Sequence, residues 1–163
     1  LHQVVLPISI EEIENSAFEN CSSLKSISLP MTLKTIGDGA LKGTGLRTIE
    51  IPKSVFWLGD GLVADCRSME HVTIPENIGR IPDHMFEGCT NLKKVELHEK
   101  LGAIGERAFF GCSSLDFIVI PDSVKQIGQD AFTNTDKQFI IQCSFGSYAE
   151  EYARKNKFKY QLV

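Results

Sequence analysis

The sequence lacks any run of apolar residues that approaches the length of a membrane span. Its 17 basic and 21 acidic residues give a formal net charge of −4, and no basic stripe of the kind that nucleic-acid-binding surfaces carry is present. The five cysteines include no Cys-x-x-Cys pair, the close spacing that zinc sites use. No secretory signal opens the sequence. These absences argue against membrane insertion, nucleic-acid binding and a zinc site.

The composition is that of an ordinary globular domain. The 163 residues are 42% hydrophobic and 23% charged, close to the average for soluble proteins. We therefore expect a packed core and no extensive disorder.

An apolar residue, usually followed by proline, recurs at a nearly constant interval. The successive steps are 23, 22, 23, 23 and 23 residues, and the short step comes from a deletion around residues 44–46. The positions are Leu6, Leu29, Ile51, Ile74, Leu97 (followed by His98) and Ile120. A fixed period of this length is the signature of a repeat solenoid, in which stacked units bury apolar faces that no single unit could bury alone.

Further columns of the repeat indicate local structure. Ile27 and Leu29 alternate with serines, the pattern of a half-buried strand, and the following proline ends the strand because it has no N–H donor. The Ala-Phe pair, as in Ala108-Phe109, predicts a single helical or 3₁₀ turn that places phenylalanine in the core. A glycine column predicts a turn with positive φ, and Glu14 and Pro82 depart from it. The column comprises Gly37, Gly59, Gly105 and Gly128.

These units resemble a known repeat. Ile120-Pro121-Asp122-Ser123-Val124-x-x-Ile127-Gly128-x-x-Ala131-Phe132, and Ala108-Phe109-Phe110-Gly111-Cys112-Ser113-Ser114-Leu115 for the second half, are similar to the BspA-like, or treponemal-type, leucine-rich repeat. The resemblance implies an α/β leucine-rich-repeat solenoid that is rich in β-structure. It would be a right-handed coil of about six 23-residue repeats with one parallel sheet and a C-terminal helix-strand cap. Relatives are typically displayed at bacterial surfaces or secreted, and some adhere to host matrix proteins or to other cells.

The two ends of the sequence differ. Residues 1–143 carry the repeats, and residues 144–163 resemble the family's C-terminal cap. Ser147 and Glu150 predict a capping box, in which the serine accepts from a first-turn amide and the glutamate reaches back to the serine amide. Phe158, Tyr160 and Leu162 alternate with polar residues and predict a last strand. The chain begins in mid-repeat, so we expect further repeats and any targeting signal upstream.

The cysteines predict a ladder of buried free thiols. Cys66, Cys89 and Cys112 are spaced by one repeat, so they should stack about 4.8 Å apart on neighbouring coils. Parallel side chains at that spacing keep their Cβ atoms farther apart than the roughly 3.8 Å of a disulfide. The four histidines fall in different columns and do not converge. We therefore predict no metal, no cofactor and no catalytic residue.

The candidate binding residues lie on the predicted sheet face. The outward positions of the last repeats put Phe117, Val119 and Ile140 side by side, where a solvated face should be polar. The adjoining rows would supply a polar rim from His71, Lys94 and Glu96. Alternatively, the C-terminal cap or a neighbouring loop covers the three apolar side chains.

The leading functional hypothesis is a non-enzymatic protein-binding module, with a host matrix or cell-surface protein as the partner class that the resemblance implies. Repeat solenoids present extended surfaces suited to this role. The alternative is a structural spacer or cap for a longer surface protein. An enzyme is the least favoured class, because the repeat frame leaves few polar residues unexplained. The oligomeric state stays open.

Overall fold

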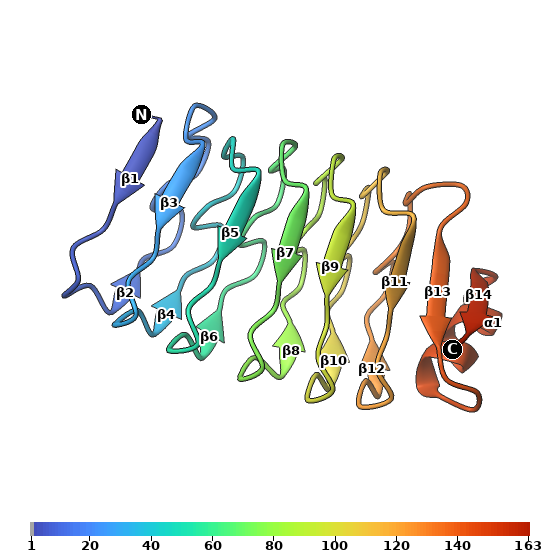
Figure 1. Cartoon of the computed structure of the whole chain (residues 1–163). Coiled ribbons are helices and arrows are strands. Elements are labelled where there is room, and N and C mark those ends of the chain that lie inside the picture. The colour runs from blue at the N-terminus through green and yellow to red at the C-terminus, as the bar shows by residue number, and fades with distance from the viewer. Residues whose placement is uncertain (1) are drawn as a thin grey trace.

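The computed structural model describes residues 2–163, which form a stack of coils (Figure 1). Each coil carries a longer strand on one face of the stack, called here the first face, and every coil except the last also carries a two-residue strand on the second face. The first-face strands are β1 (Gln3–Val5), β3 (Ser26–Ser28), β5 (Thr48–Glu50), β7 (His71–Thr73), β9 (Lys94–Glu96), β11 (Phe117–Val119) and β13 (Ile140–Cys143). The second-face strands are β2 (Glu12–Ile13), β4 (Thr35–Ile36), β6 (Trp57–Leu58), β8 (Arg80–Ile81), β10 (Ala103–Ile104) and β12 (Gln126–Ile127).

Every strand pair within residues 2–163 is parallel, and the pairs among β1 to β13 join equivalent positions of successive coils. Val4 lies opposite Ile27, and Ile49 opposite Val72. This register follows from the repeat, because a one-residue slip would turn each buried side chain outward. The predicted parallel solenoid is confirmed, but its strands form several separate parallel sheets on two faces and not the one sheet expected. The structure adds the second-face strands, which are too short for an alternating sequence pattern.

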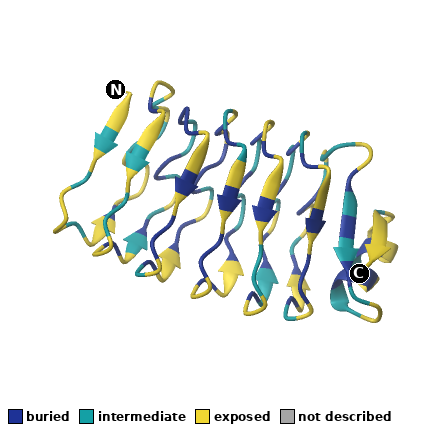
Figure 2. Cartoon of the chain, viewed as in Figure 1, coloured by how far each residue is buried: buried dark blue, intermediate teal, exposed yellow. Residues whose placement is uncertain are grey.

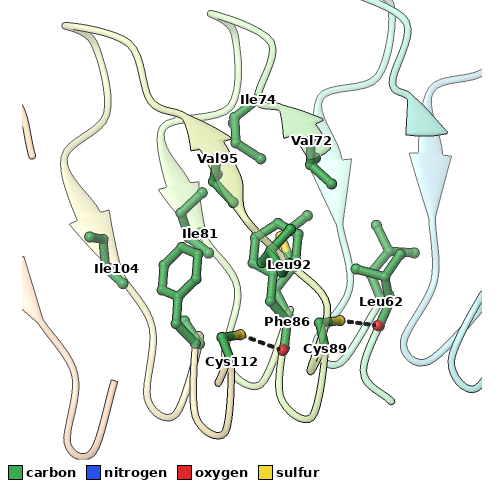
Figure 3. Packing of buried hydrophobic residues seen from close by; sticks show 14 of the residues in the cluster. Leu62, Val72, Ile74, Ile81, Phe86, Cys89, Leu92, Val95, Ile104 and Cys112 are labelled. Carbon is green, nitrogen blue, oxygen red and sulfur yellow. Dashed lines mark hydrogen bonds between the residues drawn. The ribbon is translucent and has the colours of Figure 1, made fainter. Parts of the chain in front are cut away.

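The core runs through the stack between the faces (Figure 2). The apolar columns of the repeat are buried in it, and Figure 3 shows their packing in the middle coils. Phe86, Phe109 and Phe132 stack with ring centroids 5.2 Å apart, and Phe139 follows Phe132 at 5.3 Å. These four rings, called here the aromatic stack, join successive coils.

The Ala-Phe segments form consecutive turns, so the prediction of a helical or 3₁₀ turn is wrong. Two columns that flank the Ala-Phe pair have left-handed backbone, represented in one coil by Ser16 (φ 55°) and Asn20 (φ 60°). Left-handed residues cannot continue a right-handed helix. The amides of Phe18 and Asn20 instead donate to carbonyls of the next coil, at 2.8 and 2.7 Å. The prediction that the phenylalanine enters the core is confirmed, as at Phe109.

The glycine column has a different cause from the one predicted. None of Gly37, Gly59, Gly105 and Gly128 has positive φ. A Cβ at Gly105 would lie 2.6 Å from the backbone nitrogen of Asp83 in the preceding coil, and one at Gly59 would lie 2.3 Å from that of Asp38. The column therefore needs glycine because neighbouring coils approach closely there. The left-handed positions lie elsewhere in the repeat.

All five cysteines are free, as predicted, and four of them are buried. Each thiol of the ladder donates to a carbonyl of the preceding coil: Cys112 to Phe86 at 3.1 Å and Cys89 to Val63 at 3.1 Å (Figure 3). The ladder thus links coils by hydrogen bonds as well as by packing.

The C-terminal segment contains α1 (Tyr148–Asn156) and β14 (Lys159–Leu162), which pairs in parallel with β13. Tyr152 and Phe158 pack edge-on against Phe132 at centroid distances of 6.2 and 6.3 Å. No helix within residues 2–163 is both long and apolar enough to cross a membrane.

The predicted capping box is half correct. The Ser147 hydroxyl accepts from the Glu150 amide at 3.2 Å, as expected. The Glu150 carboxylate, however, accepts from the amide of Gly146 at 2.6 Å. The Ser147 amide already donates to the Ser144 carbonyl, so it is not free to receive the glutamate.

Candidate binding surface

Phe117, Val119 and Ile140 form a continuous patch on the first face, called here the apolar patch. β11 pairs with β13 so that Phe117 lies beside Ile140 and Val119 beside Gln142. Phe117 is 42% exposed and Val119 48%, while Ile140 is partly exposed. The central residue Ile118 points into the core, so the strand has one buried and one solvated side.

The C-terminal segment does not cover the apolar patch. β14 continues the sheet beyond β13, with Lys159 opposite Ile140 and Gln161 opposite Gln142. The alternative in which this segment buries the patch is therefore wrong. A strand that adds to the edge extends the first face, and the exposed ends of β11 remain visible in Figure 2.

The predicted polar rim lies on one side of the apolar patch, but one of its three predicted residues does not lie beside the patch. Lys94 and Glu96 lie on β9, next to β11, and their side chains form an ion pair at 2.6 Å. The Lys94 ammonium holds the pKa of the Glu96 carboxyl below its usual value. His71 lies opposite Lys94 on the next strand, about 10 Å from β11 by the usual strand spacing. The structure therefore brings Lys94 and Glu96 to the patch but leaves His71 outside it.

A second rim, missed by the sequence analysis, lies on the other side. The Lys159 ammonium donates to the side-chain oxygen of Gln138 at 2.5 Å. The side-chain amide nitrogen of Gln142 donates to the side-chain oxygen of Gln161 at 3.0 Å. The alternating pattern identifies the last strand but not its partner, so it could not place these residues. The apolar patch therefore lies between two borders of charged and amide side chains.

Reactive groups lie away from the patch. The thiol of Cys112 is buried in the core, and burial raises its pKa to about 12. No group of three or more His, Cys, Asp or Glu side chains in the described part of the chain is arranged to hold a metal ion. The patch offers shape and apolar area for contact with another molecule.

A second exposed apolar site was also missed. Phe56 and Trp57 are 63% and 61% exposed and line a hollow of about 340 Å³ on the second face. The signal was present in the repeat frame. Trp57 shares its column with the polar residues Glu12, Thr35 and Arg80.

Comparison with solved structures finds similar leucine-rich-repeat proteins. A leucine rich cell surface protein of Faecalibacterium prausnitzii is 35% identical with a TM-score of 0.80, and the match covers 88% of this chain and 39% of that one. A leucine-rich repeat protein of Bacteroides ovatus is 24% identical with a TM-score of 0.69, covering 99% and 51%. The Treponema pallidum leucine rich repeat protein is 28% identical with a TM-score of 0.56, covering 86% and 57%. The chain thus spans about two fifths to somewhat over half of these proteins' lengths.

A comparison with curated protein sequences finds no match. Six copies of the BspA type leucine rich repeat match residues 11–138, which are most of the chain. The same residues form the stacked parallel coils described above, with the family's period of about 23 residues. The chain belongs to the BspA-type leucine-rich-repeat family.

Proposed function

We propose that this protein is a non-enzymatic binding module that contacts a protein partner through the apolar patch. The observation that carries the proposal is the exposure of Phe117 and Val119 on a strand face whose other rows are mostly polar. Adjacent exposed apolar side chains within a polar surround commonly mark interaction sites, and aromatic residues are enriched among the groups that dominate binding energy.

The two rims indicate what kind of partner surface fits. Lys94 and Glu96 lie on one side of the apolar patch and Lys159 on the other. An apolar anchor of the partner would bury Phe117 and Val119, while its polar groups meet the mixed charges around them. We therefore infer that the partner is a protein whose contacting surface has an apolar centre and a polar border.

At the cellular level, we propose that the module acts at the cell surface or after secretion, in adhesion or recognition of a host protein. The relative from Faecalibacterium prausnitzii is described as a cell surface protein, and it is 35% identical to this chain. Because the chain covers 39% of that relative, the role of the whole protein belongs to the proposal.

Capture of matrix and cell-surface proteins on the immobilised protein tests the proposal. The wild type is compared with a Phe117→Ser/Val119→Ser variant, and Phe145→Ser serves as the control because Phe145 is an exposed phenylalanine in the turn between β13 and α1. Circular dichroism and the urea midpoint establish that all three proteins are folded. We expect a partner that the wild type and the control retain and the double variant loses. Equal capture by all three contradicts a role for the patch.

The alternative is a structural spacer that holds another part of a longer surface protein away from the cell. The continuous core, which extends from Ile13 to Ala153, favours it because such a stack is stiff along its length. A spacer predicts no partner lost on substitution of the patch, so the same capture experiment separates the two roles.

A further inference from the structure

The second face is interrupted between β6 and β8. β4 pairs with β6, and β8 with β10, but no backbone hydrogen bond joins β6 to β8 among the described residues. No Cα atom of β6 lies within 8 Å of one in β8, whereas paired strands lie about 4.8 Å apart. Figure 1 shows the wider spacing at this point.

Pro82 accounts for the interruption. In neighbouring coils, Gly59 donates its amide to Ile36 at 2.8 Å, and Gly105 donates to Ile81 at 2.9 Å. Pro82 occupies the equivalent position and has no N–H to donate to Leu58. Its ring also adds atoms in the column where the coils otherwise approach most closely.

The opening is local, because the same two coils remain joined next to it. Gly61 donates its amide to the Asp83 carbonyl at 2.8 Å. The Asp83 amide in turn donates to the Asp60 carboxylate at 3.0 Å. The separation is confined to the two strands and the residues directly beside them.

Backbone groups on both sides of the opening have no hydrogen-bond partner within residues 2–163. In neighbouring coils Phe56 donates to Lys34 at 3.0 Å and Gly102 donates to Gly79 at 2.8 Å. The corresponding bond from the Gly79 amide to the Phe56 carbonyl is missing, as is any bond to the Leu58 carbonyl. The opening therefore presents one acceptor on β6, one acceptor just before it and a donor just before β8, as two strand edges do.

The side chains around the opening form a hollow with an aromatic wall. Phe56 and Trp57 supply the wall, and Gly79 leaves the opposite side low, since a Cβ there would meet no atom within 4 Å. The hollow has a volume of about 340 Å³. Large exposed rings opposite a single glycine leave room for an incoming chain.

The hollow is also negatively charged. Asp38 and Asp60 each use one carboxylate oxygen to accept from the amide of the next coil, at 2.9 and 3.0 Å. No basic side chain within residues 2–163 forms an ion pair with either of them. The one arginine in the lining, Arg80, is paired with Asp83 at 2.5 Å. The two carboxylates, each without an ion-pair partner within residues 2–163, suit a basic side chain of a ligand.

We propose that the opening between β6 and β8, called here the strand gap, binds an extended polypeptide segment that carries a basic residue. One inserted strand needs about 9.6 Å between its neighbours, in keeping with a separation above 8 Å. Its amides donate to the carbonyls of Phe56 and Leu58, and its carbonyl accepts from Gly79. Main-chain pairing of this kind supplies affinity, while side-chain pockets supply specificity. The site is separate from the apolar patch and independent of the function proposed for it.

Trp57 provides the readout, because it is the only tryptophan in the protein. The probes are two blocked hexapeptides, one alternating valine with lysine and one alternating valine with glutamate. We expect a saturable change in Trp57 fluorescence with the lysine peptide and binding at least tenfold weaker with the glutamate peptide. No change with the lysine peptide, or equal binding of both, overturns the proposal. A similar change in Trp57 fluorescence with an uncharged glucose oligomer also overturns the proposal, because such a ligand is not a polypeptide and carries no basic residue.

Two variants connect binding to the strand gap. Pro82→Gly restores the missing amide and should close the gap, abolishing the fluorescence response, whereas Pro75→Gly in the same coil should leave it intact. Asp60→Asn removes a charge but keeps the acceptor for the Asp83 amide, as Asn15 does for Asp38 at 2.8 Å. It should weaken lysine-peptide binding about fivefold, the effect of one partly exposed ion pair. Unchanged binding in both Pro82→Gly and Asp60→Asn contradicts the proposal, and Phe117→Ser/Val119→Ser should bind the peptide as the wild type does.

Discussion

The thiols of the core ladder are held in the neutral form by their surroundings. Burial raises the pKa of Cys112 to about 12 and raises those of Cys66 and Cys89 as well. The thiolate is the reactive species, so a raised pKa and burial both slow alkylation. Cys21 is the exception in exposure, since it is partly accessible.

We therefore predict that iodoacetamide modifies one thiol in the native protein, Cys21, and all five only after unfolding in urea. Mass spectrometry of time points gives the count and the positions. Modification of Cys112 in native protein at a rate similar to that of Cys21 would show that the coils open far more readily than the packing implies.

Glu87 should make the stability depend on acid pH. Arg107 donates to its carboxylate at 2.6 Å, and this bond, followed by that of His84, holds the pKa of Glu87 below its usual value. A carboxyl with a lowered folded-state pKa stabilises the fold above about pH 4.5 and loses that contribution as the pH falls through the folded-state value. Glu87→Gln should thus cost about 1 kcal/mol at neutral pH, and this cost should shrink as the pH falls below about 4.5, measured by urea unfolding. An undiminished difference at pH 3 would exclude the carboxylate charge as the cause.

For single residues, the sequence predicted which side chains are buried but not which backbone conformations the residues adopt. The burial of Cys112 and Phe109 could be predicted because the same residue types recur at their positions in successive repeats. Gly105 was assigned positive φ because glycine satisfies either a left-handed backbone or a close approach, and a sequence does not distinguish them. His84 and Arg107 have positive φ, which their residue types did not indicate.

Among the elements, α1 depends on one buried carboxylate at its start. Glu150 is almost fully buried, accepts from Gly146 and receives Arg154 at 2.6 Å. Glu150→Ala removes the carboxylate that accepts from the Gly146 amide and from Arg154, and should destabilise the protein by about 2 kcal/mol, the scale of hydrogen bonds to a charged group. Glu151→Ala, at an exposed position in the same turn, is the control and should change the urea midpoint little. Equal effects of the two substitutions would mean that general helix charge, and not the Gly146 contact, stabilises the segment.

The longer strands could be predicted because three residues with one inward side chain repeat in every coil. The second-face strands could not, since two residues carry no periodicity. Pro82 was recognised as a departure from its column. Its effect on the pairing of β6 and β8 depends on which carbonyl lies opposite, which only the register of the coils provides.

For the molecule as a whole, the aromatic stack couples the C-terminal coils. Phe109 lies between Phe86 and Phe132 at 5.2 Å from each, and it is fully buried. Phe109→Ala should destabilise the fold by about 4 kcal/mol through lost burial and a cavity. Phe56→Ala, at an exposed position, should shift the urea midpoint little. If both variants unfold alike, the stack does not hold the coils together.

The position of the apolar patch on the whole molecule could be predicted in part. The repeat frame placed Phe117, Val119 and Ile140 together, because equivalent positions of adjacent coils must be neighbours. It extended the rim too far, to His71, although the order of the strands already places His71 two strands away from β11. Lys159 and Gln161 were missed because the partner of β14 is set by the path of the chain through α1.

The proposed function requires that the stacked coils present the apolar patch to a protein partner. Hydrogen–deuterium exchange of the protein with and without the captured partner tests it most directly. We expect added protection in residues 116–120 and 139–142 and none in residues 55–58. Protection confined to residues 55–58 and 78–82, or absent from residues 116–120, would contradict the claim and place the partner elsewhere.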